Sequence, residues 1–378
     1  MKKVGILGGG QLGRMLLQAA ANYPVITYVL ENDEECPSAH LCNQFIKGDI
    51  TSYNDVYEFG KNLDALTIEI ESVNLEALYQ LEKEGKKIYP NPSALAIIKN
   101  KKKQKEFYVA LNVPTAPFII VSGKEDLKRN IDFFPAAQKL ALGGYDGKGV
   151  QILRSEMDIP NGFNEESVLE KEIAIKKEIA IIIGVNEKGA TAMYNPVEMI
   201  FNTSLNLLDF QLSPARLEEK ILWKAEAIAL MVVKNLKSAG IFAVELFLDV
   251  NDKIWVNETA PRVHNSGHHT IEGNYSSQFD MLWRIILDYP LGNTRQIMNS
   301  ALVNLVGEQD ISGIPVYEGL EKLLEIENVF VHIYNKRITK PGRKMGHITI
   351  LSNERQELIH VANKIKQNFK ISVNGAHD

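Results

Sequence analysis

A short apolar segment that runs straight into a glycine turn constrains the fold of this chain more than any other feature. Residues 3–7 (KVGIL) have the character of a buried strand, and GGGQLG follows directly. Residues 12–21 then have the spacing of an amphipathic helix, and residues 25–30 (VITYVL) predict a second strand. Strand, turn, helix and strand together form the unit of a parallel sheet. We therefore expect an open α/β domain at the start of the chain.

The turn itself fits the GxGxxG pattern through Gly8, Gly10 and Gly13. Glycine lets the backbone approach a phosphate closely, and the helix N-terminus adds a partial positive charge. Glu31 ends the next strand, about where an acid that binds a ribose would lie. This Rossmann-like pattern alone allows a dinucleotide cofactor, and hence a nicotinamide-dependent oxidoreductase. The same turn also serves a single phosphate, or close helix packing without a ligand.

Composition excludes several classes of protein. Among 378 residues, 42 Lys and Arg stand against 47 Asp and Glu, so the net charge is −5 and no nucleic-acid partner is expected. The longest apolar runs, such as residues 179–183, fall far short of the roughly 20 residues of a membrane span, and no secretory signal is visible. Cys36 and Cys42 lack disulfide or CxxC spacing. We expect a cytoplasmic enzyme without a membrane partner.

The order of expected elements divides the chain into three domains. Residues 66–71 (LTIEIE) predict a further strand, and Tyr89-Pro90-Asn91-Pro92 interrupts regular structure, so an N-terminal domain is expected over 1–98. Strands and helices mix over 99–290. Residues 291–378 contain shorter strand-like pieces and a final helix, which indicate a small α+β domain.

Two helices of the central domain are predicted from their patterns. Residues 99–111 begin with five lysines in seven residues, and charge pattern alone favours a solvated helix face there. Residues 217–239 have one wide apolar face, and Gly240 stands where a left-handed cap would close the helix.

Residues 143–149 (GGYDGKG) form a candidate polyphosphate loop, with four glycines and one lysine in seven residues. Backbone amides and an ammonium group in such a loop can wrap a phosphate chain. GxxxxGK[ST] is absent, so the loop is not of the Walker type. Lys139 lies upstream at the end of an expected strand and could hold an α- or β-phosphate. A glycine-rich hairpin with a solvent-facing lysine is the alternative.

A pair of acidic residues falls on an expected β-hairpin. Apolar runs flank Asn251-Asp252, which suits a two-residue turn. If Val250 pairs with Lys253, Glu245 lies directly opposite Glu258. Facing carboxylates repel, and a divalent cation between them would remove that conflict. We favour a metal over a solvent-exposed pair at the rim of a sheet.

The expected register also assigns the neighbours of this pair. Ala243, Phe247 and Val256 would share the face of the two glutamates. Simple alternation would place Asn257 on the other face, so no role for Asn257 follows from this geometry.

Two further stretches carry groups suited to anions and protons. In residues 260–270 (APRVHNSGHHT), Arg262 suits a planar or anionic substrate group, and His264 could move a proton near neutral pH. The histidine spacing is not of the HExxH kind, and a loop histidine can equally be structural. In residues 340–347 (KPGRKMGH), Lys340, Arg343 and Lys344 surround a Pro-Gly turn, which is either a phosphate site or a solvated turn.

Taken together, GGGQLGRM, GGYDGKG, VNETAPRVHNSGHHT, SQFD and PGRKMGH, in this order and spacing, resemble the N5-carboxyaminoimidazole ribonucleotide synthetase family. The resemblance covers essentially the whole chain. It implies a pre-ATP-grasp α/β domain, a central ATP-grasp domain with a hinged glycine-loop subdomain at about 115–175, and a small C-terminal domain. It also implies a homodimer.

The same resemblance implies an activity in purine biosynthesis. ATP and bicarbonate would give carboxyphosphate, which breaks down to CO₂ and phosphate. The exocyclic amine of 5-aminoimidazole ribonucleotide would then capture CO₂ as a carbamate. A closed, dry site rich in cations protects such an anionic intermediate from water.

The resemblance assigns roles to individual residues. Expected at ATP are Lys101, Lys139, Gly143, Gly144, Tyr145, Asp146, Gly147, Lys148, Gly149, Glu170, Lys171, Glu172, Ile173, Glu178, Asn257 and Glu258. Of these, residues 170–173 would sit against adenine and Glu178 would bind the ribose hydroxyls. Expected at Mg²⁺, with Mn²⁺ as a possible substitute, are Glu245, Asn257 and Glu258. Expected at the ribonucleotide and bicarbonate are Gly10, Gln11, Leu12, Tyr145, Asp146, Arg262, His264, Asn265, Lys340, Arg343 and Lys344, with Asp146, Arg262, His264 and Lys344 in catalytic roles.

The chain departs from the family pattern at two places. Leu140, Ala141 and Leu142 stand where arginines are common, and Met199 and Phe201 stand where Asn and His are common. A non-catalytic nucleotide sensor is therefore one alternative. Another ATP-grasp ligase, such as a formate-using glycinamide ribonucleotide transformylase or a biotin-dependent carboxylase, is a second. The HNSGHH continuation after APR favours the carboxylating reaction. An oxidoreductase would leave GGYDGKG and the two glutamates without a purpose.

Overall fold

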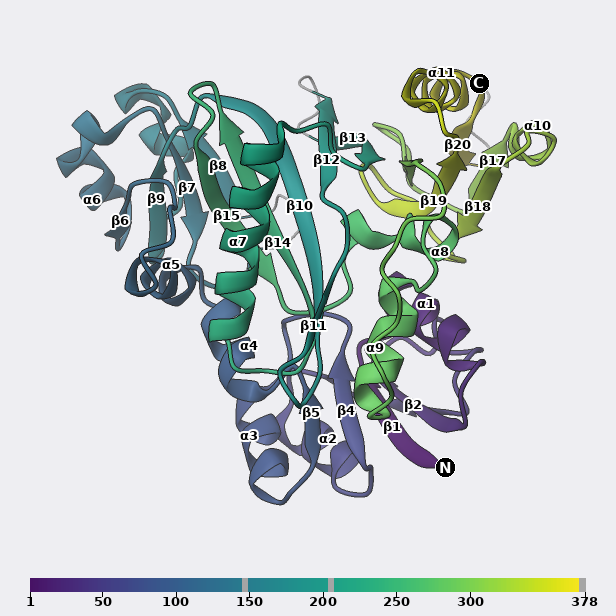
Figure 1. Cartoon of the computed structure of the whole chain (residues 1–378). Helices are drawn as coiled ribbons and strands as arrows, with labels where there is room; N and C mark the ends of the chain where they lie inside the picture. Colours follow the sequence, from purple (N-terminus) through teal and green to yellow (C-terminus); the bar gives the residue numbers. More distant parts are fainter. Residues whose placement is uncertain (145–148, 203–206, 374–378) are drawn as a thin grey trace.

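The computed structural model describes residues 1–144, 149–202 and 207–373, and of residues 201, 202 and 207–209 it describes the backbone only. In Figure 1 the N-terminal domain lies at the base and the long strands of the central sheet rise above it. The glycine-loop subdomain and the C-terminal domain flank that sheet on opposite sides. Within the described residues, no helix is both long and apolar enough to cross a membrane.

The strands follow one another in this order: β1 (Lys2–Leu7), β2 (Val25–Glu31), β3 (Gln44–Lys47), β4 (Ala65–Ile68), β5 (Lys87–Tyr89), β6 (Phe118–Val121), β7 (Ala136–Leu140), β8 (Val150–Leu153), β9 (Ser167–Lys171), β10 (Ile175–Val185), β11 (Thr191–Met193), β12 (Val197–Asn202), β13 (Leu207–Ser213), β14 (Gly240–Asp249), β15 (Ile254–Ala260), β16 (Ser300–Val306), β17 (Pro315–Glu318), β18 (Val329–Ile333), β19 (Lys344–Leu351) and β20 (Lys370–Val373).

The α-helices are α1 (Gln11–Ala20), α2 (Tyr53–Gly60), α3 (Leu75–Lys83), α4 (Pro92–Ile98), α5 (Lys101–Ala110), α6 (Lys124–Arg129), α7 (Glu219–Asn235), α8 (Thr270–Gly273), α9 (Gln278–Ile286), α10 (Leu320–Leu324) and α11 (Arg355–Asn368). Short 3₁₀ turns are η1 (Ile131–Phe133), η2 (Glu156–Asn161) and η3 (Asn265–Gly267).

The N-terminal domain contains the parallel sheet that the sequence predicts, with strand order β3-β2-β1-β4-β5. Strand β4 stops at Ile68, so Glu69 and Glu71, expected within a strand, lie in the loop past its carboxyl end. The proline-rich segment interrupts regular structure only at Pro90 and Asn91, because Tyr89 ends β5 and Pro92 begins α4.

A long antiparallel sheet, with order β15-β14-β10-β12-β13-β16-β19-β18, forms the centre of the molecule. Helix α7 covers one face, where Ile181 and Val244 join its apolar side. Helix α9 covers the other face and packs in turn against α1, where the Trp283 indole donates a hydrogen bond of 2.7 Å to the Leu16 carbonyl oxygen. Pairing of β13 with β16 continues this sheet into the C-terminal domain, so β16, β18 and β19 share a sheet with the central domain. β17 and β20 form a separate two-stranded sheet.

A second sheet, β6-β9-β7-β8, belongs to the glycine-loop subdomain. Residues 172–174 join its strand β9 to β10 of the central sheet. The Lys101 amide also donates a 2.9 Å hydrogen bond to the Ala141 carbonyl oxygen, which ties the first residue of α5 to the end of β7. Side chains from both sheets can therefore meet at this junction.

The predicted hairpin of β14 and β15 has the right acidic pair but the wrong turn. Glu245 pairs with Glu258, as expected, yet nearer the turn Leu248 pairs with Ile254, one residue out of the expected register. The connection is a longer turn in which Asp252 has a left-handed backbone (φ 59°). A bulge between Glu245 and Leu246 on one strand restores the expected pairing.

The bulge also changes which side chains share a face. Val256 pairs with Leu246 and lies in the core beneath α7, so our assignment of Val256 to the face of the glutamates is wrong. A bulge places an extra residue on one strand and re-aims its side chain, which is how Asn257 comes to face Glu245.

The end of helix α7 also differs from the prediction. The helix ends at Asn235, and Lys237, with φ 49°, takes the left-handed position that we assigned to Gly240. Gly240 is instead the first residue of β14. Glycine was the obvious residue for that conformation, but a lysine with positive φ occupies it here.

Candidate active site

Helix α5 presents two of its lysines to the junction between the two sheets. Lys101 pairs with the carboxylate of Glu258, and Lys105, one turn later, is buried and pairs with Glu170 at 2.9 Å. Burial lowers the pKa of each of these two amines to about 8. The prediction of a solvated helix face is therefore wrong for Lys101 and Lys105. It holds for Lys102, which makes an exposed pair with Glu166.

Glu170 lies between two ammonium groups at the end of β9. Its Oε2 is 2.9 Å from Lys105 Nζ, and its Oε1 is 3.1 Å from Lys139 Nζ. Burial alone would raise the pKa of this carboxyl, but the two lysines outweigh it and hold the pKa below its usual value. The predicted nucleotide residues Lys139 and Glu170 are thus in contact, through side chains and not only through the backbone.

The acidic pair on β14 and β15 continues this network. Lys139 Nζ donates to Asn257 Oδ1 at 2.8 Å, and Asn257 Nδ2 donates to Glu245 Oε2 at 3.3 Å. Burial raises the pKa of Glu245, against the opposing charges of Lys101 and Lys139. All three predicted metal ligands therefore meet at one place, together with both predicted phosphate lysines.

These residues fit a magnesium ion bound with a nucleotide. Mg²⁺ usually takes one or two carboxylates and completes its shell with phosphate oxygens and water. Glu245 and Glu258 supply two facing carboxylates and Asn257 a neutral oxygen. Among the described residues, no group of three His, Cys, Asp or Glu side chains forms a site that could hold a metal by itself. The donor set thus suits a cation that arrives with its own phosphate ligands.

His264 lies at the edge of the same cluster. Its Nε2 is 3.5 Å from Glu245 Oε1, and its Nδ1 accepts from the Ser266 amide at 3.3 Å. A ring whose Nδ1 accepts carries its neutral-state proton on Nε2. His264 in this tautomer is a hydrogen-bond donor directed toward the acidic pair. Its neighbour Asn265 begins η3, and the Asn265 carbonyl oxygen accepts from Gln211.

Glu178, the predicted ribose ligand, occupies the same face of the central sheet. On β10 it pairs with Met199 of β12 on one side and Phe247 of β14 on the other. Burial raises the pKa of Glu178 to about 7, with a further contribution from the charge of Glu245. One of the atypical residues, Met199, is buried directly beside it, whereas the side chain of Phe201 lies outside the described residues.

The other nucleotide residues have mixed outcomes. Lys171 Nζ donates to the carbonyl oxygens of Phe133 and Phe134, so it stabilises its own subdomain. Glu172 and Ile173 lie in the connection to β10, beside the junction. Gly143 and Gly149 have positive φ (84° and 78°), which suits a tight loop, and Gly144 lies beside Gly149. Tyr145, Asp146, Gly147 and Lys148 lie outside the described residues.

The N-terminal glycine turn already holds carboxylates of its own chain. Gly9 N donates to Glu31 Oε2 at 3.0 Å, and Leu12 N donates to Glu69 Oε1 at 3.1 Å. These amides are the groups with which such a turn would bind a pyrophosphate. The dinucleotide interpretation of Gly8, Gly10 and Gly13 gains no support from this geometry, because Glu31 faces the turn itself.

Arg262 joins the N-terminal domain to the central one. Its Nε lies 2.9 Å from Glu71 Oε1, and its charge also opposes the burial that raises the pKa of Glu69. The predicted substrate residues Gly10, Gln11 and Leu12 at the start of α1 therefore lie near Arg262 through Glu69.

The C-terminal cationic turn is only partly directed at this site. The charge of Lys344 contributes to lowering the pKa of Glu245, against the effect of burial, and to lowering the pKa of the buried His268. Arg343 donates to the Ile338 carbonyl oxygen of its own loop at 2.6 Å, and Lys340 is exposed on the turn. Nothing in their contacts brings these last two residues to the cluster.

Sequence reasoning missed three residues of the site: Lys105, Glu69 and Glu71. Lys105 was hidden within a run of lysines, and only the fold distinguishes the buried members from the exposed ones. Glu69 and Glu71 had a usable signal, since ligands of an open parallel sheet bind outside the carboxyl ends of its strands. Extending β4 three residues too far, to Glu71, concealed it.

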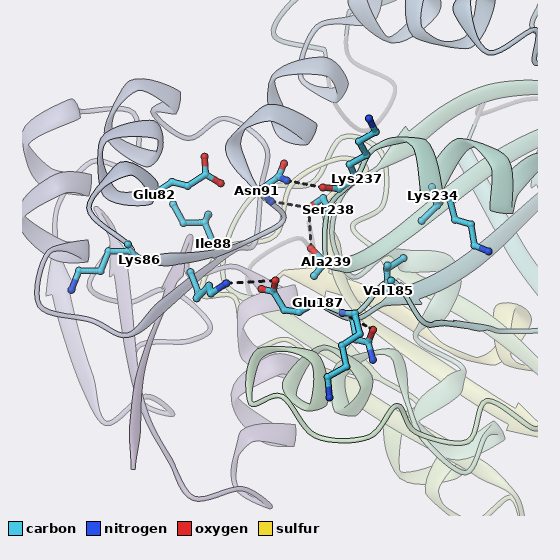
Figure 2. Close-up of a pocket in the computed structure, with 16 residues that line it drawn as sticks. Glu82, Lys86, Ile88, Asn91, Val185, Glu187, Lys234, Lys237, Ser238 and Ala239 are labelled. Carbon is cyan, nitrogen blue, oxygen red and sulfur yellow. Dashed lines mark hydrogen bonds and ion pairs between the residues drawn. The ribbon is translucent and has the colours of Figure 1, made fainter.

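A separate hollow of about 730 Å³ lies between the N-terminal domain, the turn after β10 and the end of α7. Figure 2 shows its labelled lysines, Lys86, Lys234 and Lys237, pointing in different directions and not toward one another. Lys87 pairs with Glu187 across it at 3.6 Å. Among the described residues, none of the predicted site residues lines this hollow, so it is distinct from the cluster described above.

Known protein families match the chain in the same order as its domains. Residues 1–99 match a ribonucleotide synthetase preATP-grasp domain, residues 106–279 an ATP-grasp domain, and residues 300–361 a phosphoribosylaminoimidazole carboxylase C-terminal domain. The predicted fold class is confirmed by these matches. The residue boundaries that we placed between the domains stay predictions.

Relatives and solved structures agree with these matches. A phosphoribosylaminoimidazole carboxylase of Vigna aconitifolia, named as chloroplastic, is 34% identical over 365 residues, which are 93% of this chain and 64% of that protein. The chain spans about two thirds of the length of the first curated relatives that it matches.

Among solved structures, N5-carboxyaminoimidazole ribonucleotide synthetase from Thermotoga maritima has a TM-score of 0.89 and 37% identity, with 99% of this chain and 100% of that chain covered. The Aspergillus clavatus N5-carboxyaminoimidazole synthase in complex with ADP and 5-aminoimidazole ribonucleotide has a TM-score of 0.85 and 32% identity, with 96% and 99% covered. The chain belongs to the N5-carboxyaminoimidazole ribonucleotide synthase family of ATP-grasp ligases.

Proposed function

We propose that this chain catalyses the ATP- and bicarbonate-dependent carboxylation of 5-aminoimidazole ribonucleotide to N5-carboxyaminoimidazole ribonucleotide, a step of purine biosynthesis. One observation carries the proposal. Lys101, Lys139 and the facing carboxylates of Glu245 and Glu258 meet at the junction between the central sheet and the sheet of the glycine-loop subdomain. Arg262 and His264 lie beside them. The Aspergillus clavatus relative, which has this fold, was crystallised with ADP and the aminoimidazole nucleotide.

The nucleotide end of the site consists of groups that can change partners. Lys101 and Lys139 now neutralise Glu258 and Glu170, and ammonium groups on flexible stems can turn to phosphate oxygens instead. Glu245, Asn257 and Glu258 would hold Mg²⁺, which neutralises phosphate charge when bound. Glu178 would accept hydrogen bonds from the ribose hydroxyls.

The substrate end of the site would bind anions and the aminoimidazole ring. Arg262, held by Glu71, presents a planar cation between the N-terminal and central domains. His264 directs its Nε2 proton toward the acidic pair and can donate it to a bicarbonate or carboxyphosphate oxygen. Lys344 adds a positive charge at the same place. The glycine loop, with Tyr145 and Asp146, would exclude water from the intermediate.

The proposed reaction proceeds through carboxyphosphate and CO₂. A bicarbonate oxygen attacks the γ-phosphorus of ATP, and ADP leaves. Carboxyphosphate then releases phosphate and CO₂, and the amine forms a C–N bond to CO₂ while losing one proton. A homodimeric state and a cytoplasmic location complete the proposal, as expected for this family.

The proposal is tested by phosphate release from MgATP with bicarbonate, with and without 5-aminoimidazole ribonucleotide. Stimulation by that nucleotide is the expected result. Release that depends on glycinamide ribonucleotide with formate would instead indicate the transformylase reaction. Tight ATP binding with no turnover under any of these conditions would indicate a nucleotide sensor and contradict the proposed activity.

A further inference from the structure

One buried ion pair lies next to the nucleotide residues and has no part in the reaction as described. The side chain of Lys105 is 3% exposed, and its Nζ lies 2.9 Å from Glu170 Oε2. The same ammonium donates to Thr115 Oγ1 at 2.6 Å, and Thr115 Oγ1 donates to the Val256 carbonyl oxygen at 2.8 Å. Lys105 is thus held between two groups of the protein and is closed off from solvent.

A buried lysine needs a reason, because taking a charge out of water is costly even when the charge is paired. A methionine of similar length would fill the same space without that cost. The contacts of Glu170 supply the reason. Its second oxygen is 3.1 Å from Lys139, whose ammonium also reaches Asn257. Glu170 therefore shares its negative charge between a fixed cation and a functional one.

Without Lys105, Lys139 would be the sole cation at a buried carboxylate. Attraction in a low-dielectric site would then hold the Lys139 ammonium on Glu170, away from Asn257 and from an incoming phosphate. With Lys105 present, part of that attraction is already satisfied, so Lys139 can leave Glu170 at a smaller cost.

We propose that Lys105 is a positioning residue for the nucleotide site, which acts through Glu170 to keep the ammonium of Lys139 available to ATP phosphate. The inference rests on the proposed function, since it assigns Lys139 to a phosphate. It adds a residue that makes no contact with the nucleotide.

The test compares Lys105→Gln with the wild-type chain by titration calorimetry with Mg²⁺ and the non-hydrolysable analogue AMP-PNP. Glutamine can still donate to Thr115, so the change removes the charge while it retains a hydrogen bond. We expect the Kd to rise about tenfold, the magnitude typical of a lost buried charge interaction. The kcat at saturating ATP should stay within about threefold, because only the availability of Lys139 changes.

The double variant Lys105→Gln, Glu170→Gln makes the test specific. It removes the carboxylate that would capture Lys139, so the Kd should be at least about threefold lower than that of Lys105→Gln. This variant leaves no unpaired charge at position 105 or 170, and it serves as the readout if the single variant does not fold. A merely structural role for Lys105 would change the Kd only together with the free energy of unfolding, so urea denaturation of both variants distinguishes the two roles.

Lys102→Gln is the matched control on the same helix, because Lys102 makes an exposed pair with Glu166. It should leave the Kd unchanged, since exposed ion pairs contribute little. An unchanged Kd in Lys105→Gln, or a double variant as weak as the single one, would overturn the inference while the proposed function stands. Absence of AMP-PNP binding by the wild-type chain would instead contradict the nucleotide site itself, and the inference with it.

Discussion

Two acidic regions of this molecule satisfy their carboxylates in opposite ways. At the N-terminal glycine turn, Glu31 and Glu69 accept from backbone amides. At the junction between the central sheet and the sheet of the glycine-loop subdomain, Glu170 and Glu258 pair with lysine side chains. Backbone donors are fixed by the fold, whereas lysine ammonium groups can turn to a new partner. In the first region two amides of the turn are already occupied by carboxylates. In the second, lysine side chains can exchange their carboxylates for a phosphate.

The largest loss of activity is expected from a change at the junction, where lysine side chains pair with carboxylates. Glu258→Gln removes one of the two facing carboxylates and leaves Lys101 without its partner, so MgATP turnover should fall by at least about 100-fold. Phosphate release measures the loss, and circular dichroism should show the fold retained.

Glu166→Gln is the control for that variant, since Glu166 pairs with a lysine of the same helix on the exposed side. It should keep near-normal turnover. Near-normal turnover in Glu258→Gln would show that this carboxylate is not part of the metal site.

The acidic pair also shows how far sequence reasoning reached. Glu245 opposite Glu258 was predicted correctly, although the turn that justified it was wrong. A longer turn and a bulge each shift the register by one residue, and the two shifts cancel at this pair. Alternation alone could not place Asn257, because a bulge at that position depends on tertiary packing.

Burial is the other point at which the sequence falls short. The lysines of α5 form one run, yet Lys105 is buried and Lys102 is exposed. Helical spacing puts Lys101 and Lys105 on one side, but only the position of β9 shows that this side faces carboxylates. The N-terminal sheet was easier to predict, because short apolar runs and the helix between them are local features.

A second prediction concerns the pH dependence of nucleotide binding near the junction. Burial raises the pKa of Glu178 to about 7, and the charge of Glu245 adds to the shift. If the carboxylate form binds the ribose hydroxyls, nucleotide affinity is full above that pKa and declines as the pH falls through it. The Kd for AMP-PNP should therefore rise about tenfold between pH 8 and pH 6, since the ionised fraction falls by that factor.

Glu178→Gln distinguishes this carboxyl from the ionisation of the nucleotide. Its binding should be weaker at pH 8 and should change less with pH than that of the wild-type chain. An identical pH dependence in the two proteins would remove Glu178 from the ribose site.

The smallest effect on nucleotide binding is expected from a change at the N-terminal glycine turn. Glu31→Ala removes the acceptor for the Gly9 amide, so the free energy of unfolding should fall by about 1–3 kcal/mol. The Kd for AMP-PNP should not change. Urea denaturation and calorimetry measure the two quantities. A change in Kd of more than about threefold would place the glycine turn in the nucleotide site and contradict the contrast drawn between the regions.

A crystal structure with Mg²⁺ and AMP-PNP tests the exchange of partners most directly. We expect the ammonium groups of Lys101 and Lys139 on phosphate oxygens, with Glu245 and Glu258 on a shared cation. A triphosphate bound at the turn of residues 8–10, with Lys101 still on Glu258, would contradict the account.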